Sequence, residues 1–182
     1  MNVPPTPDAI VPPNFTAPFD TLLGMQFTEL GPDGARAQLE VTPNLLQPMG
    51  LVHGGVYCSM HESLASVAAY TWLNASGDGG NVVGVNNNTD FLRSISSGTV
   101  YGRAEPIHRG RRQQLWLVTV TDDNDRVVAR GQVRLQNLEV YPTSSLRVPV
   151  SWPPGWFPPS RGPRPPVRPA VPAAFARRPA GP

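Results

Sequence analysis

Two adjacent glycines, Gly54 and Gly55, stand directly before a long uninterrupted stretch without proline, residues 56–73, which predicts the principal helix. Glycine permits unusual backbone angles, and at the start of a helix it leaves the first N–H groups uncovered. Those groups form the positive end of the helix and can hold an oxyanion. The pair therefore predicts an oxyanion-binding helix start or, more plainly, a turn before a helix.

Glu62 is the only acidic residue of this predicted helix, and His61 is its only basic residue. A solvated helix face normally carries several long charged side chains. The residues that share a face with Glu62 have small side chains instead. At spacings of three, four and seven this face holds Gly55, Cys58, Ser59, Ala65, Ser66 and Ala69. The lone carboxylate thus predicts a cleft or an interface, with an incidental surface position as the alternative. The opposite stripe predicts core contact with a sheet: Val56, Met60, Leu64, Val67 and Thr71.

Alternating or β-branched runs surround this helix and must position it. A short helical turn at 19–23 and strands at 26–30 and 35–41 precede the helix, with a turn at 31–34 between the strands. Four strand-like runs follow at 82–91, 98–107, 113–121 and 127–138. Their short connections favour antiparallel neighbours over parallel crossovers. We expect an α+β domain in which a sheet of about six strands packs against, or curls around, one long helix.

Proline and charge mark the borders of this domain. Of the 23 prolines, six lie in residues 1–20 and 13 in residues 141–182, which leaves four for the middle 120 residues. The last 42 residues hold six arginines and no acid, so the overall net charge of +2 comes from them. We therefore predict a proline-rich extension at 1–18, a globular domain at 19–140, and a disordered tail rich in Pro and Arg at 141–182. A basic surface for nucleic acid is not expected.

Other features narrow the class of protein. The single cysteine, Cys58, excludes an intramolecular disulfide and fits a reducing compartment. The first residues lack a basic start and an apolar core, and no run of 18 apolar residues occurs, so we expect a cytoplasmic protein without a membrane partner. The histidines and Cys58 do not show zinc spacing, and no phosphate-binding or dinucleotide glycine loop occurs. No metal or cofactor is predicted.

The run from Met49 through His53, Gly54 and Gly55, with an acid nine residues after the histidine, resembles the hotdog-fold acyl-CoA thioesterases of the PaaI-like and Arthrobacter 4-hydroxybenzoyl-CoA type. The resemblance spans about residues 19–140. It includes the order of strands and helix, Gln47 six residues before the histidine, Ser66 four residues after Glu62, and the segments 89–93 and 109–111. It implies an antiparallel sheet wrapped around a central helix.

The resemblance also implies roles for the residues that match. The Gly54 N–H would polarise the thioester carbonyl, and Glu62 would act as general base or nucleophile. Gln47 would contact the acyl part or orient the carbonyl, and Ser66 would contact the substrate or Glu62. His53 would shape the loop, with a structural role as open as a catalytic one. Eight helical residues separate Gly54 from Glu62 by about 12 Å, which is too far for both to meet one carbonyl in one chain.

A second subunit must then supply one of the two groups, and the resemblance implies a homodimer or homotetramer with active sites at the subunit interface. The expected partner of each site is an acyl-CoA, aromatic or medium-chain. The predicted substrate-binding residues are Gly55, Asn88, Thr89, Asp90, Arg93, Arg109, Arg111 and Arg112. The arginines are candidates for the CoA phosphates. Solvated turns for the arginines, and sheet hydrogen bonds for the asparagines, are the alternatives.

The rival function is a catalytically silent hotdog protein that binds an acyl ligand or serves as a scaffold. It would keep the fold and the dimer but would not need Glu62. The presence of that carboxylate favours an enzyme that hydrolyses acyl-CoA to free acid and CoA.

Overall fold

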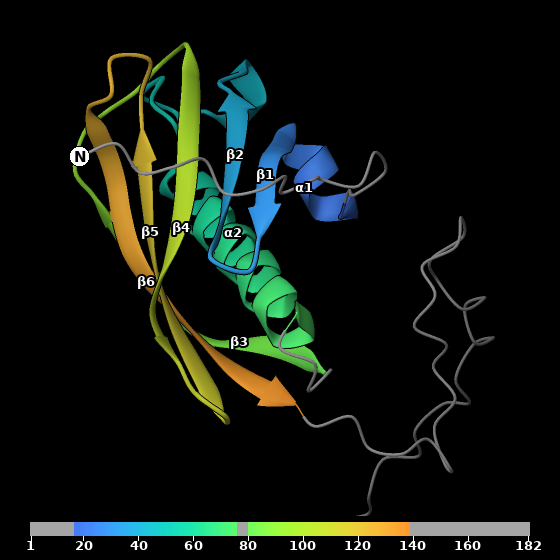
Figure 1. Ribbon diagram of the computed structural model, residues 1–182. Coiled ribbons are helices and arrows are strands. Elements are labelled where there is room, and N and C mark those ends of the chain that lie inside the picture. Colours follow the sequence, from blue (N-terminus) through green and yellow to red (C-terminus); the bar gives the residue numbers. More distant parts are fainter. Residues whose placement is uncertain (1–16, 76–79, 139–182) are drawn as a thin grey trace, which may run out of the picture. The chain divides into compact units, whose positions relative to one another are not determined.

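The computed structural model describes residues 17–75 and 80–138 of the 182-residue chain. The predicted tail at 141–182 and all but the last two residues of the predicted extension at 1–18 lie outside the described residues. The elements follow the predicted order (Figure 1). They are α1 (Pro18–Leu23), β1 (Met25–Gly31), β2 (Gly34–Glu40), a 3-10 turn (Pro43–Leu45), α2 (Gly54–Ala75), β3 (Asn81–Phe91), β4 (Thr99–Arg109), β5 (Gln113–Thr121) and β6 (Val127–Leu138).

The six strands form one antiparallel sheet in the order β1-β2-β4-β5-β6-β3, which confirms the predicted α+β class. Strand β3 therefore lies at one edge of the sheet, although it follows α2 directly in the chain. The sheet curls so that α2 contacts all six strands (Figure 1). Among the described residues, no helix is both long enough and apolar enough to cross a membrane.

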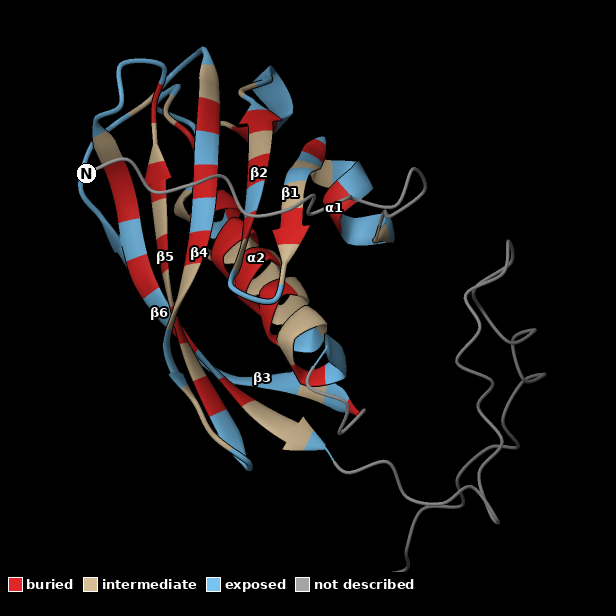
Figure 2. Ribbon diagram, viewed as in Figure 1, coloured by how far each residue is buried: buried red, intermediate tan, exposed pale blue. Residues whose placement is uncertain are grey.

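The curl of the sheet buries more of α2 than the predicted stripe (Figure 2). Met60 and Leu64 are fully buried as expected, but so are Ala65 and Ala69, which the sequence pattern grouped with Glu62 on a small-residue face. The prediction that this whole face borders a cleft is therefore wrong for these two alanines. A flat sheet would cover one stripe of a helix, whereas a curved sheet reaches around it.

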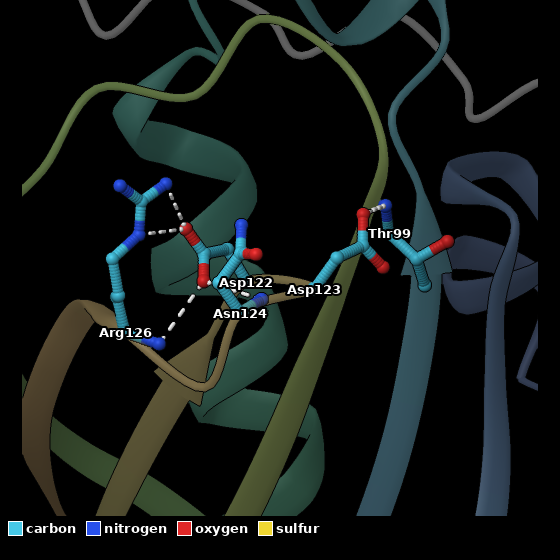
Figure 3. A network of polar contacts seen from close by, with 5 residues as sticks. All are labelled: Thr99, Asp122, Asp123, Asn124 and Arg126. Carbon is cyan, nitrogen blue, oxygen red and sulfur yellow. Dashed lines mark hydrogen bonds and ion pairs between the residues drawn. The ribbon is translucent and has the colours of Figure 1, made fainter.

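The turn at 122–125 joins β5 to β6 and is closed by the buried carboxylate of Asp122 (Figure 3). Asp122 Oδ1 accepts the N–H groups of Asn124 and Arg126 at 2.9 and 3.0 Å, and its Oδ2 accepts the Arg126 guanidinium at 2.7 and 2.9 Å. The next residue, Asp123, accepts the Thr99 N–H at 3.0 Å and thereby ties the turn to β4. The Arg126 side chain holds the pKa of the Asp122 carboxyl below its usual value.

Because that pKa is lowered in the folded state, ionised Asp122 stabilises the fold above the unfolded pKa of about 4, and the stabilisation is lost as pH falls through the folded value. We expect Asp122→Asn to lower the melting temperature at pH 7 and to weaken its fall between pH 7 and pH 3. Thermal unfolding followed by circular dichroism measures both. Asp125→Asn, at an exposed carboxylate of the same turn, is the matched control. An unchanged acid dependence in Asp122→Asn would contradict this account.

Candidate active site at the start and middle of helix α2

Helix α2 begins at Gly54, and the side chain of His53 caps it. His53 Nδ1 accepts the Gly55 N–H at 2.9 Å, and the His53 carbonyl accepts the Val56 N–H at 2.9 Å. An accepting Nδ1 places the proton of the neutral ring on Nε2. The Gly54 N–H, by contrast, makes no hydrogen bond to a described residue. Of the two predicted glycine donors, Gly54 is therefore the one left open for a ligand.

Gln47 belongs to a tight turn that precedes this helix start. Its carbonyl accepts the Gly50 N–H at 2.9 Å, and Gly50 has a φ of 77°, which favours glycine. The Gln47 Oε1 atom accepts the Met49 N–H. The side-chain amide is thus oriented by its oxygen, and its Nε2 donor makes no hydrogen bond to a described residue.

Gln47 and Gly54 line one cavity of about 280 Å³. Its other lining residues are Leu51, Val52, Tyr57, Phe91, Leu92, Arg93, Ser94 and Ile95. Phe91 lies against the helix start, because a Cβ atom on Gly54 would come within 2.8 Å of its ring. The hydroxyl of Tyr57 is buried without a partner among the described residues, and burial raises its pKa. An open backbone donor thus meets aromatic and aliphatic surface, which suits a carbonyl attached to an apolar group.

Glu62 lies two turns further along α2, half-buried against β3. Its Oε2 accepts Asn87 Nδ2 at 3.1 Å, and its Oε1 lies over Gly84, where any Cβ would collide with it. Asn87 Nδ2 also donates to the Cys58 carbonyl at 3.0 Å. Asn87 therefore holds the carboxylate by Oε2, and only glycine at position 84 of β3 leaves room for Oε1.

A β-bulge decides which side chains of β3 face the helix. The pairing with β6 slips between Gly84 and Asn86, so that Val85 is an extra residue. Without the slip, alternation from Gly84 would turn the even-numbered residues toward α2. After it, Asn87, Thr89 and Phe91 contact α2. Bulges commonly redirect side chains in this way.

The predicted binding residues of β3 are thereby separated. The Thr89 hydroxyl faces α2, where it donates to Asn87 Oδ1 at 2.8 Å and lies 2.8 Å from His61 Nδ1. Asn88 and Asp90 are exposed, and alternation directs their side chains to the opposite face of the sheet. The structure therefore brings Thr89 toward Glu62 and leaves Asn88 and Asp90 away from it.

The other predicted residues lie in four places. The Ser66 side chain is half-buried on α2, and its hydroxyl makes no hydrogen bond to a described residue. Arg93 is exposed beside the cavity at Gly54, whereas Arg111 and Arg112 line a second cavity of about 570 Å³ with His108, Gly110, Gln113 and Gln136. Arg109 is engaged elsewhere, because it pairs with Asp33 at 2.8 Å, donates to the Pro32 carbonyl and lies over the Trp72 ring.

Sequence reasoning missed three residues around Glu62, namely Asn87, Gly84 and His61. His61 is fully buried, and burial lowers its pKa to about 4. The one local signal was Gly84 inside the predicted strand at 82–91, because an isolated glycine in a strand often marks a bulge or a close approach. That signal does not identify Asn87, because which side chains face the helix depends on pairing with β6. In the part of the chain that the structure describes, no group of three or more His, Cys, Asp or Glu side chains is placed to hold a metal ion.

Known proteins are similar to this chain in sequence and in architecture. Residues 49–129 match the family described as the thioesterase superfamily. The chain is 75% identical over 138 residues to the Mycobacterium tuberculosis protein Rv1847, an esterase by name, and covers 99% of that protein and 76% of itself. The solved structure of Rv1847 superposes with a TM-score of 0.67, over 69% of this chain and 100% of that chain, at 77% identity.

More distant relatives extend the likeness. The proofreading thioesterase EntH of Cronobacter turicensis is 36% identical over 104 residues, which are 57% of this chain and 74% of EntH. A mutant of the phenylacetic acid degradation protein PaaI of Thermus thermophilus superposes with a TM-score of 0.60 at 25% identity, over 67% of this chain and all of that one. With its six-stranded sheet curled around α2, the chain belongs to the hotdog-fold thioesterase superfamily, as its resemblance predicted, and is a hydrolase.

Proposed function

We propose that this protein hydrolyses an acyl-CoA thioester to a free acid and CoA. The observation that carries the proposal is the orientation of Glu62, whose Oε2 is fixed by Asn87 while the carboxylate stays half-buried on the central helix. The N–H of Gly54, which no described residue accepts, supplies the complementary donor. A base and an oxyanion donor are the two groups that hydrolysis of a thioester requires.

Charge flow assigns a task to each group. Attack on the thioester carbonyl places negative charge on its oxygen, which the Gly54 N–H and the start of α2 stabilise by about 3 kcal/mol. As a general base, Glu62 takes a proton from the attacking water; as a nucleophile, it attacks the carbonyl carbon itself and forms an anhydride. In both routes the C–S bond breaks and the thiolate of CoA leaves. In the second route, water then hydrolyses the anhydride to the free acid and restores Glu62. Gln47 Nε2, open in the same cavity as Gly54, helps to orient the carbonyl.

Both groups lie on α2, and eight residues at 1.5 Å each separate them by about 12 Å. We therefore propose that each site combines Gly54 of one protomer with Glu62 of another, in a homodimer or homotetramer. The edge strand β3 supports such a partner. It has exposed apolar residues along and just beyond it, namely Val83, Val85, Phe91 and Leu92, each 43–56% exposed. An exposed apolar edge of this length favours pairing with another chain.

Two cavities support the proposed substrate class. The cavity at Gly54 offers Phe91, Leu92 and Ile95 to an aromatic or medium-chain acyl group. Arg93 beside it, and Arg111 and Arg112 at the second cavity, are free of ion pairs among the described residues and suit the phosphates of CoA. Arg109, which Asp33 neutralises, is the weakest of these candidates. The cytoplasmic location stays a prediction.

The rival function, a silent acyl-ligand-binding or scaffolding protein, predicts that Glu62 is dispensable. The oriented carboxylate favours the enzyme. Substitution of Glu62 separates the two functions.

Glu62→Gln keeps the size of the side chain but removes the base, and we expect kcat to fall about 10²- to 10⁴-fold. Release of CoA from a panel of aromatic and aliphatic acyl-CoAs measures the effect. Glu40→Gln, at an exposed glutamate of β2, makes the same chemical change away from the site and is expected to leave kcat unchanged. Full turnover in Glu62→Gln would exclude this mechanism, and acyl-CoA binding without turnover in the wild type would favour the rival.

Gly54→Pro tests the backbone donor. Proline is tolerated at the first position of a helix, and it removes the N–H that the mechanism needs. Gly54→Ala is the matched control, since both variants place a Cβ against the Phe91 ring but alanine keeps the N–H. We expect kcat of Gly54→Pro to lie about 10²-fold below that of Gly54→Ala. Equal values in the same CoA-release assay would argue against a role for this donor.

Mixing the two inactive variants tests the shared site. In a dimer of Gly54→Pro with Glu62→Gln, one site loses both groups and the other keeps both. Random reassociation from denaturant of an equal mixture gives half mixed dimers, so we expect about a quarter of wild-type activity. The wild type, denatured and refolded alone, sets the reference. If each site lies within one chain, the refolded mixture stays as inactive as its components.

A further inference from the structure

We infer that His61, Thr89 and Asn87 form a relay of oriented hydrogen bonds whose task is to position the Glu62 carboxylate. The inference rests on the proposed function, which it deepens by adding three positioning residues. The side chains are linked in one line by distances of 2.8 Å from His61 to Thr89, 2.8 Å from Thr89 to Asn87, and 3.1 Å from Asn87 to Glu62.

The direction of each bond is fixed by its acceptors. Asn87 Nδ2 lies between the Cys58 carbonyl and the Glu62 carboxylate, and both of these only accept, so the amide nitrogen must face them. Asn87 Oδ1 then faces Thr89 and accepts its hydroxyl proton. The Thr89 hydroxyl has one hydrogen, which it donates to Asn87, so its oxygen must accept a hydrogen bond from His61 Nδ1.

His61 is therefore the neutral tautomer with its proton on Nδ1. Burial, which lowers the pKa of His61 to about 4, keeps the ring neutral at neutral pH. Every proton in the line points toward Glu62, and such aligned bonds strengthen one another in a water-poor interior. The relay ends at Asn87 Nδ2, which donates to Glu62 Oε2. A donor at this position holds the carboxylate in place and leaves Oε1 to accept a proton.

Packing alone does not explain this arrangement. His61 is fully buried, and its Nε2 has no partner among the described residues. An apolar side chain would avoid that unsatisfied atom, so stability favours another residue at this position. The fold also leaves room for the ring, because a Cβ on Gly131 of β6 would lie 2.9 Å from Nδ1. Local violations of packing rules of this kind gather at functional sites.

The test removes one link and then restores it. Thr89→Val deletes the hydroxyl with little change of shape, and we expect kcat to fall on the order of 10-fold with KM within about twofold. Thr89→Ser returns the hydroxyl and should restore kcat to within about twofold. Asn86→Ala, at an exposed position of β3 on the opposite face, controls for damage to the strand.

A double-mutant cycle separates positioning from mere stability. If Thr89 acts through Glu62, Thr89→Val leaves the residual rate of the Glu62→Gln enzyme unchanged within about twofold. Unchanged kcat in Thr89→Val, or a 10-fold loss that persists in Glu62→Gln, would overturn the relay. Full activity of Glu62→Gln would instead overturn the proposed function. Should Thr89→Val fail to fold by circular dichroism, Asn87→Asp takes its place, since it keeps the shape and turns the donors at Glu62 into acceptors; wild-type kcat there overturns the relay.

Discussion

A carboxylate on a helix that a sheet encloses must reach water or meet a donor, and Glu62 meets the amide of Asn87. That contact depends on the edge strand β3, which lies along α2 with Phe91 at Gly54, Asn87 at Cys58 and Glu62, and Gly84 at Glu62. The bulge at Val85 gives these residues a common face. The architecture of the sheet, and not the helix alone, thus makes Glu62 a defined chemical group.

At the start of α2 a side chain acts as acceptor and satisfies a backbone donor, whereas at Glu62 a side chain acts as donor. His53 takes up the Gly55 N–H, and the turn at Gln47 holds that side chain by its oxygen. At one cavity, the Gly54 N–H and the Gln47 amide nitrogen have no acceptor in the part of the chain that the structure describes. The glycines by themselves would present two equivalent donors to a ligand, and capping by His53 leaves one.

These two centres lie on one rigid helix about 12 Å apart, and the helix cannot bend to join them. The same edge strand that orients Glu62 carries exposed apolar side chains, including Val85. A shared site would therefore place catalysis and association on one strand, so that a change at the edge of β3 would affect both.

The sequence by itself determined the order and type of the elements, because apolar periodicity and turn residues act over a few positions; the helix at 56–73 and the strand at 82–91 are found almost unchanged as α2 and β3. It also singled out Glu62 and Gly54. Only the tertiary structure decided that Asn87 and Thr89 face the helix while Asn88 and Asp90 do not, because pairing with the distant strand β6 sets the bulge. Burial of His61 and pairing of Arg109 with Asp33 arise in the same way, from the curl of the sheet and from a contact 76 residues apart in the chain.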